Sequence, residues 1–277
     1  MSVIEIENLV KKYGDNLAVD NLNLKIEKGR VYGFLGPNGA GKSTTMNIIT
    51  GYIGATSGTV KIDGRDIFKE PEQAKKCVGY LPEMPPLYQD MTVREYLKFV
   101  AELKKIPKGK REKNIEDALN MTKTDQVENR LIRNLSKGYK QRVGIAQALI
   151  GMPEVIILDE PTAGLDPVGK DQILNLLKKL HEEKKITIIL VSHSMEDVAD
   201  YAQRVIVMNG GQVMYEGDKK EVFSHKKELE EAGLAVPFYR QVCEELADRG
   251  FPIQRDLLTL EETKEAILEG LKGLRGK

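Results

Sequence analysis

The sequence has no tryptophan, few cysteines and no long apolar run. Its 277 residues include only two cysteines, Cys77 and Cys243, which are too few and too far apart for a disulfide framework or a zinc site. We therefore expect reduced thiols, as in a cytosolic protein. No apolar run approaches the ~18 residues that span a bilayer, and the amino terminus lacks a signal-peptide pattern. We expect a soluble protein, with any membrane part supplied by another chain.

The sequence also lacks an excess of either charge. Lysine and arginine together number 42, as do aspartate and glutamate, so the formal net charge is zero. Because no overall basic field would attract nucleic acid, we expect no DNA or RNA partner. A chain of this length could form one large α/β domain or a core with attached subdomains.

The clearest motif lies in residues 31–45. An apolar run at residues 31–35 predicts a short strand, and the sequence from Lys42 onward predicts a helix. Residues 36–43 between them fit the G-x-x-x-x-G-K-[ST] phosphate loop, whose glycines let successive amides turn toward a polyphosphate at a helix start. Lys42 is expected to reach the terminal phosphates, and Ser43 to bind Mg²⁺. The residues expected to bind the nucleotide here are Gly36, Pro37, Asn38, Gly39, Ala40, Gly41, Lys42, Ser43 and Thr44.

Two kinds of strand pattern surround this loop. Alternation of apolar and polar residues predicts a small antiparallel subdomain with one solvated face; it occurs at residues 4–6, 22–26 and 60–62. Unbroken apolar runs are typical of parallel strands covered by helices; they occur at residues 155–158 and 186–191. A helical apolar stripe between these two runs completes a strand-helix-strand unit, which predicts a doubly wound α/β core. Residues 205–215 predict a hairpin.

Helical patterns fill residues 85–151 and 219–277. In the first segment, Thr92 and Glu95 fit a capping box, and a third helix is expected to begin near Ser136. In the second, short amphipathic helices are expected, with another capping box at Thr259 and Glu262. We therefore predict a domain at residues 1–218 with an inserted helical subdomain at about 85–151, followed by a helical carboxy-terminal extension at 219–277.

Further candidate site residues lie next to predicted strands. Asp159 and Glu160 close an apolar strand, where a parallel sheet presents its ligands. Downstream of a phosphate loop, Asp159 is expected to hold Mg²⁺ and Glu160 to polarise water. Tyr13 precedes the second predicted strand, where it could stack on a base or pack at the sheet edge. His193 follows another parallel strand.

Four motifs in a fixed order resemble those of an ATP-binding-cassette (ABC) ATPase over residues 2–218. They are GPNGAGKST, LSKGYKQR, IILDEPTAGLD and VSHS. The resemblance implies a P-loop NTPase (RecA-like) core with ATP and Mg²⁺ as cofactors. It also implies a head-to-tail dimer, of identical or similar ATPase chains, that holds two ATP molecules between its subunits. Ser136 and Gly138 in the signature segment would contact the γ-phosphate held by the other subunit.

The same resemblance implies individual roles in hydrolysis. Glu160 would be the catalytic base, Lys42 would hold the phosphates, and His193 would contact the γ-phosphate and sense hydrolysis. Tyr13 matches the aromatic residue that stacks on adenine. Asp166 would lie in the loop that crosses the dimer interface.

Two departures from the family pattern stand out. Lys137 and Tyr139 replace the glycine and glutamine of the commonest signature, although Ser136 and Gly138 are retained. Glu83 stands where the loop before the helical insertion usually carries a glutamine that touches Mg²⁺. A carboxylate there could meet Mg²⁺ directly or through water, or could be a solvated loop charge.

The two halves of the chain resemble different ABC ATPases. The first half is similar to export-type ATPases, and the part from about Ile173 is similar to the ATPases of energy-coupling-factor vitamin and metal importers. The membrane subunit of this family docks between the core and the helical insertion, so the first half of the chain should decide the partner. We therefore expect an export-type transporter subunit at the cytoplasmic face of the membrane, with a polytopic membrane partner. The alternatives are an energy-coupling-factor importer ATPase and a soluble non-transport ABC ATPase.

Overall fold

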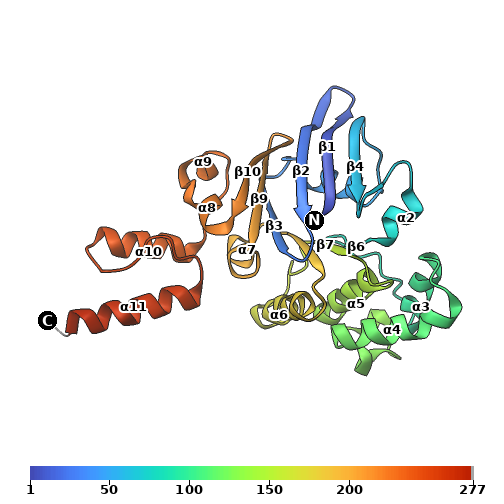
Figure 1. The fold of residues 1–277 in the computed structure, drawn as a ribbon. Coiled ribbons are helices and arrows are strands. Elements are labelled where there is room, and N and C mark those ends of the chain that lie inside the picture. Colours follow the sequence, from blue (N-terminus) through green and yellow to red (C-terminus); the bar gives the residue numbers. More distant parts are fainter. Residues whose placement is uncertain (276–277) are drawn as a thin grey trace.

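Two β-sheets form the centre of the molecule, and the computed structural model describes residues 1–275 of it (Figure 1). The first sheet is antiparallel, in the order β2-β1-β4-β5. Its strands are β1 (Ser2–Tyr13), β2 (Asn16–Glu27), β4 (Ser57–Ile62) and β5 (Arg65–Asp66). The buried residues of these strands include Ile4, Ile6, Leu22, Leu24, Ile26, Val60 and Ile62. The predicted antiparallel subdomain is confirmed.

The second sheet has six strands in the order β10-β9-β3-β8-β7-β6. They are β3 (Val31–Leu35), β6 (Val78–Leu81), β7 (Val155–Asp159), β8 (Thr187–Val191), β9 (Arg204–Asn209) and β10 (Gln212–Asp218). All neighbouring pairs from β9 to β6 are parallel, and β10 closes the edge as an antiparallel hairpin with β9. Gly210 and Gly211 form the hairpin turn, both at positive φ, as a two-residue loop of this kind requires. This is the predicted α/β P-loop core.

One strand was not predicted from the sequence. Only Glu83 was placed in the loop that leads to the helical insertion, and the residues just before it, 78–81, form β6, which pairs with β7 at the sheet edge. Gly79 interrupts the apolar pattern of this stretch, so the four residues resemble a loop in sequence. A Cβ at Gly79 would lie 2.2 Å from the carbonyl oxygen of Ala148, so the glycine instead allows the helix of Ala148 to approach the strand closely.

Helices cover both faces of the six-stranded sheet. Those of the ATPase core and insertion are α1 (Lys42–Ile49), α2 (Pro71–Lys76), α3 (Val93–Leu103), α4 (Lys108–Thr122), α5 (Lys137–Leu149), α6 (Pro167–Lys184) and α7 (Met195–Tyr201), with short 3₁₀ turns at Asp125–Val127 and Ile132–Asn134. The remaining helices are α8 (Lys219–Ser224), α9 (Lys226–Glu231), α10 (Phe238–Asp248) and α11 (Leu260–Arg275). At 16 residues, α11 is longer than the short helices expected in this region.

Alternate residues of the parallel strands enter different apolar layers, which explains their unbroken apolar runs. Tyr32 and Phe34 of β3 pack with α1 and the antiparallel sheet. Leu190 of β8 points to the opposite face, where it packs with α5 and α6. The strands are therefore held rigidly, and the loops at their carboxyl ends have a fixed base.

Helix α5 belongs to two layers at once. Its Ile145 and Leu149 pack on the parallel sheet, whereas Val143 and Ala146 pack with α3 and α4. The predicted limits of the insertion, about 85–151, therefore enclose a helix that also covers the core. Both capping boxes form, at Thr92 with Glu95 and at Thr259 with Glu262.

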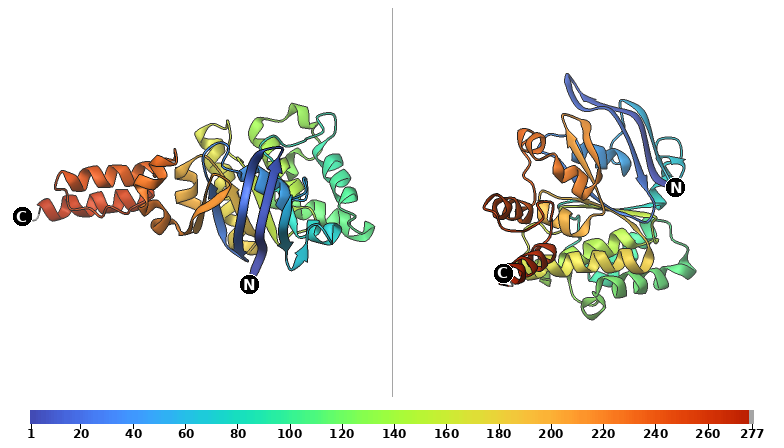
Figure 2. Two further views of the ribbon diagram at one scale, coloured as in Figure 1. Left: turned by 90° about the horizontal axis from the view of Figure 1, so that it is seen from above. Right: turned by 60° about the vertical axis from the view of Figure 1, so that its left-hand side comes forward.

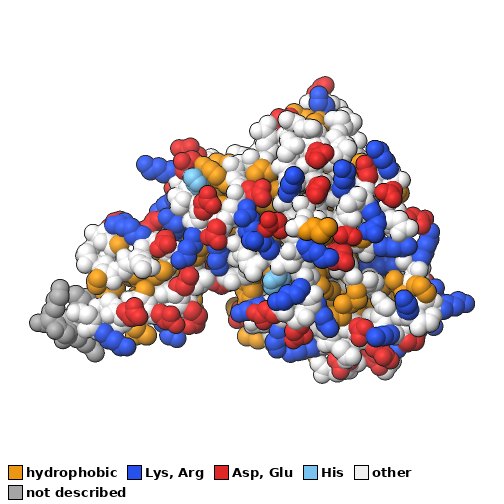
Figure 3. All heavy atoms as spheres, in the orientation of Figure 1, with side chains coloured by type: hydrophobic (Ala, Val, Ile, Leu, Met, Phe, Trp, Pro, Cys, Tyr) orange, Lys and Arg blue, Asp and Glu red, His pale blue; other side chains and the backbone are white. Residues whose placement is uncertain are grey.

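Helices α10 and α11 extend from one side of the molecule as an arm (Figure 2). Acidic and basic side chains are interspersed over the face seen in Figure 3, as the balanced composition predicts. Within residues 1–275, no helix combines the length and apolarity needed to cross a membrane.

Candidate nucleotide-binding site

The phosphate loop connects β3 to α1 and is shaped by three glycines. Gly36, Gly39 and Gly41 have φ values of 153°, 81° and 95°. At two of them a side chain would also collide with backbone: a Cβ would lie 2.5 Å from the carbonyl oxygen of Met208 at Gly36, and 2.5 Å from that of Ala18 at Gly41. The loop is therefore pressed between β2 and β9, which holds its amides in place.

Lys42 fills the inside of this loop. Its buried side chain donates hydrogen bonds to the carbonyl oxygens of Gly36, at 2.6 Å, and Pro37, at 3.0 Å. Burial lowers the pKa of Lys42, while the Glu160 and Asp159 carboxyls act in the opposite direction. Ser43 is exposed in the first turn of α1, where helix amides lack intrahelical partners. The loop thus combines a buried cation with the unpartnered amides at the start of α1, a combination that suits a polyphosphate.

Asp159 and Glu160 stand at the carboxyl end of β7, beside β8. Asp159 is buried and pairs with Val191, and the Glu160 N–H donates to the Val191 carbonyl oxygen at 2.9 Å. Glu160 has a φ of 47°, in the left-handed region that a non-glycine residue rarely adopts. The Nε2 atom of His193 lies 3.6 Å from Glu160 Oε1. The two predicted hydrolytic groups are therefore adjacent.

Burial determines the charge behaviour of these carboxyls. Desolvation raises the pKa of Glu160 to about 7, with smaller contributions from the Asp159 and Glu83 carboxyls, while the His193 backbone N–H and Lys42 act in the opposite direction. Desolvation and Glu83 likewise raise the pKa of Asp159. Burial and Lys42 lower the pKa of His193. A carboxyl that titrates near neutral pH is suited to act as a general base.

Five predicted site residues lie close enough to shift one another's pKa: Lys42, Glu83, Asp159, Glu160 and His193. Ser136 caps α5 by accepting the Tyr139 N–H. Within residues 1–275, neither Ser136 nor Gly138 makes a hydrogen bond to the phosphate loop, and a Cβ on Gly138 would meet no atom within 4 Å. Ser136 is therefore exposed, and the space beside Gly138 is open.

Tyr13 ends β1 and is 49% exposed. Lys11 Nζ lies 4.9 Å from the centre of the Tyr13 ring, at the hairpin between β1 and β2. The same hairpin brings Ala18 against Gly41 of the phosphate loop. The ring therefore stands near the end of the loop without being packed into the core.

Sequence reasoning missed a partly buried network beside Glu160 and His193. Thr162, Lys170, Ser194 and Asp197 are joined by hydrogen bonds and an ion pair. Thr162 and Ser194 lie within the motifs recognised in the sequence, but no spacing pattern links them to Lys170 or Asp197.

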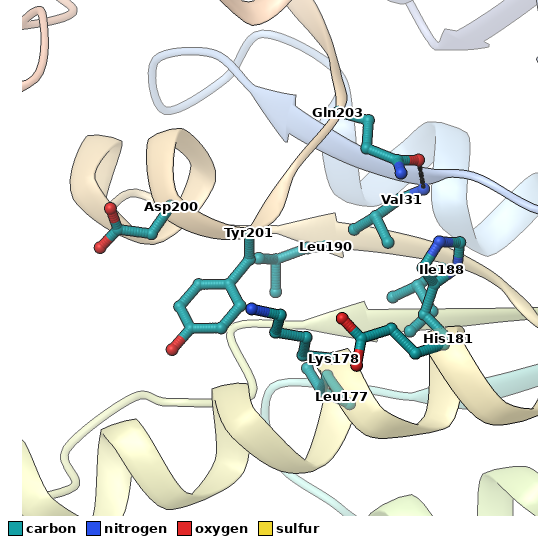
Figure 4. Close-up of a pocket in the computed structure, with 10 residues that line it drawn as sticks. Val31, Leu177, Lys178, His181, Ile188, Leu190, Asp200, Tyr201 and Gln203 are labelled. Carbon is teal, nitrogen blue, oxygen red and sulfur yellow. Dashed lines mark hydrogen bonds between the residues drawn. The ribbon is translucent and has the colours of Figure 1, made fainter. Parts of the chain in front are cut away.

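A separate small cavity of about 120 Å³ lies at the opposite end of the parallel strands (Figure 4). Val31 and Ile188, from the amino ends of β3 and β8, form its apolar floor, and His181 and Gln203 lie at its rim. The Val31 N–H donates to Gln203 Oε1 at 3.1 Å. Because parallel sheets present ligands at their carboxyl ends, this cavity is not part of the nucleotide site.

Sequence and structure comparisons agree on the family. Residues 19–163 match the family described as ABC transporter. The energy-coupling factor transporter ATP-binding protein EcfA2 of Clostridium perfringens is 38% identical over 278 residues, covering 96% of this chain and 97% of that protein. EcfA2 of Clostridium tetani is also 38% identical, with 96% of each chain covered.

Solved structures give the same result. CbiO1 from Clostridium perfringens, described as part of the ABC transporter complex CbiONQ, has a TM-score of 0.75 and 33% identity over 90% of this chain and 97% of that one. The dimeric cassette MJ0796 bound to ADP and Pi has a TM-score of 0.68 and 30% identity over 78% of this chain and 98% of that one. The named relatives favour the energy-coupling-factor alternative over the export-type expectation. The chain belongs to the ABC transporter family, as one of its ATP-binding, ATP-hydrolysing subunits.

Proposed function

We propose that this chain is an ATPase subunit of an energy-coupling-factor importer. One observation carries the proposal: the similarity to EcfA2 extends over almost the whole of both chains, including the region beyond the ATPase core. The export-type expectation rested on the first half of the sequence alone. A soluble non-transport role has no such full-length counterpart among these relatives.

In this proposal the phosphate loop holds ATP. Backbone N–H groups of the loop and of the first turn of α1, together with the Lys42 ammonium, bind the phosphates, and the exposed Tyr13 ring stacks on adenine. Glu160, whose pKa burial raises to about 7, accepts a proton from the attacking water. His193, 3.6 Å from Glu160, contacts the γ-phosphate. In-line attack needs positioning and charge neutralisation more than covalent chemistry.

Mg²⁺ fits the donors at this site. The Ser43 hydroxyl and the Asp159 carboxyl are oxygen ligands, with Glu83 close enough to raise the pKa of Asp159. Among the described residues, no three His, Cys, Asp or Glu side chains gather to hold a metal by themselves, so nucleotide oxygens would complete the shell. The ion would neutralise phosphate charge during transfer.

The proposed assembly is a head-to-tail pair in which each ATP meets the phosphate loop of one chain and Ser136 and Gly138 of the other. The open surface of Gly138 and the exposure of Ser136 support this arrangement. The second chain would be an identical or a similar ATPase. Because MJ0796 is covered over 98% of its length by only 78% of this chain, residues 219–277 are proposed to be an extension to a complete cassette.

The proposed membrane partner would dock beside β6 and α3. A groove of about 810 Å³ lies there, lined by α2, the ends of α3 and α5, and the turn after α1. Tyr52 and Leu103 on its surface are 80% and 65% exposed, and Lys75, Lys76 and Lys105 lie beside them. The chain would thus sit at the cytoplasmic face of the membrane.

Affinity purification from membranes tests this proposal. The full-length chain should recover a polytopic membrane subunit, and a Leu103→Glu variant should recover much less of it while keeping its ATPase activity. Recovery of the membrane subunit of an exporter, or of ribosomes, would contradict the importer assignment.

A further inference from the structure

A buried carboxylate joins the segments that carry Glu160 and His193. Asp197 lies on α7, and its side chain is only 3% exposed. Its Oδ1 atom is 2.5 Å from Lys170 Nζ on α6, and its Oδ2 atom accepts a hydrogen bond from the Thr162 hydroxyl at 3.1 Å. Thr162 is two residues beyond Glu160. Both oxygens of one carboxylate are therefore occupied, each by a different segment.

The same cluster holds the residue next to His193. Lys170 Nζ donates to Ser194 Oγ at 3.3 Å, and the Asp197 N–H donates to the same oxygen at 3.2 Å. Ser194 begins α7 as its N-cap, and its own N–H donates to Ser192 Oγ at 3.1 Å. The turn that carries His193 is thereby tied to α6 through Lys170.

The side chain of Glu160 is supported mainly from the His193 turn: His193 Nε2 lies 3.6 Å from its Oε1 atom, and the His193 backbone N–H lowers the pKa of the carboxyl. Its Oε1 atom is buried and, within residues 1–275, has no hydrogen-bond partner. The register of β7 and β8 ends at Asp159 and Val191, with one further bond from the Glu160 N–H. Beyond that point, apart from the direct contact between Glu160 and His193, the two following loops are joined by the contacts of Asp197 with Thr162, Lys170 and Ser194.

We infer that Lys170 and Asp197 are positioning residues, which hold the loop after Glu160 and the turn of His193 at a fixed separation during ATP hydrolysis. The inference rests on the roles proposed above for Glu160 and His193. Neither Lys170 nor Asp197 needs to touch the nucleotide. A displacement of about 1 Å in such a pair can reduce turnover by roughly a hundredfold without weakening substrate binding.

The test measures kcat and ATP affinity separately on the full-length chain. Lys170→Met keeps the length of the side chain and removes its charge, so we expect kcat to fall about tenfold or more while the affinity for a fluorescent ATP analogue changes less than about twofold. Lys170→Arg should recover part of the lost kcat. The matched control is Lys178→Met, the same change at an exposed position of the same helix, which should leave both parameters unchanged.

A second variant keeps the test informative should Lys170→Met fold poorly. Thr162→Val is nearly isosteric and removes only the hydroxyl that binds Asp197, so it should also lower kcat more than affinity. Folding of each variant is checked by its denaturation midpoint.

A double-mutant cycle separates this inference from the proposed function. If Lys170 acts through Glu160, then adding Lys170→Met to Glu160→Gln should reduce the residual kcat less than about twofold. An equal loss in both backgrounds, an unchanged kcat, or a loss confined to ATP affinity would overturn the inference. Undiminished turnover in Glu160→Gln alone would instead overturn the role proposed for Glu160.

Discussion

Replacing Glu160 with glutamine should slow hydrolysis and stabilise the unliganded protein at the same time. Glu160→Gln preserves the size of the side chain but cannot accept the proton of the attacking water. Loss of a general base typically costs about 100-fold or more in rate, so kcat should fall by at least that factor while ATP still binds.

The stability effect follows from burial. Desolvation raises the pKa of the folded Glu160 carboxyl to about 7, from an ordinary value near 4.5. The folded state therefore disfavours the carboxylate, and the cost is fully present above pH 7 and absent well below pH 4.5. The difference in pKa corresponds to about 3 kcal/mol. The glutamine variant, neutral at every pH, should be about 3 kcal/mol more stable than the parent at pH 8 and within about 1 kcal/mol of it at pH 5.

The assay is denaturant unfolding of both proteins, without nucleotide, at several pH values between 5 and 8. The wild-type kcat/KM for ATP, measured in parallel, should rise through pH 7 as Glu160 of the free protein loses its proton. Glu154→Gln is the matched control: it precedes the same strand, but its carboxylate is exposed and pairs with Lys28, so its effect should stay below about 1 kcal/mol at every pH. A gain from Glu160→Gln that is small, or equal at pH 5 and pH 8, would refute the reasoning from burial.

Substitutions at Lys42, Tyr13 and Lys104 test separate parts of the account. Lys42→Ala removes the cation inside the phosphate loop and should abolish detectable ATP binding in a fluorescence titration; normal binding would show that the loop does not hold the phosphates. Tyr13→Ala should weaken ATP binding about tenfold, since base stacking on an aromatic ring is worth about 1–3 kcal/mol, and Tyr13→Phe should not; equal affinities in all three proteins would exclude stacking. Lys104 Nζ donates to the carbonyl oxygens of Gln147, Ala148 and Ile150 at the end of α5, so Lys104→Met should cost about 2 kcal/mol in unfolding free energy. The neighbouring Lys105→Met breaks only an exposed pair with Glu72 and should cost less than about 1 kcal/mol; equal costs would contradict the capping role of Lys104.

The features predictable from sequence are those with a strong local pattern. The apolar runs of β7 and β8, and the glycines of the phosphate loop, each leave few conformations open, so the core and the positions of Lys42, Asp159 and Glu160 follow directly. β6 was not predictable because four residues with a glycine at the second position resemble a loop. Its strand conformation depends on pairing with β7, which is distant in sequence.

Other parts of the site depend on contacts that no local pattern encodes. Asp197 meets Thr162 and Lys170 only because β7, α6 and β8 bring their ends together. The same holds for Glu160: its left-handed backbone and its buried Oε1 atom, which has no hydrogen-bond partner among residues 1–275, are consequences of packing. The four ordered motifs predicted the family correctly. The named relatives favour the energy-coupling-factor alternative, which the sequence from Ile173 onward resembles, over the export-type expectation drawn from the first half.

The central claim is that each ATP is shared between two chains. A crystal structure of Glu160→Gln with ATP and Mg²⁺ tests it most directly. The account predicts a closed dimer in which the Ser136 hydroxyl of one chain lies within hydrogen-bonding distance, about 3 Å, of the γ-phosphate held by Lys42 of the other. A dimer in which one chain supplies every phosphate ligand, with Ser136 facing solvent, would contradict it.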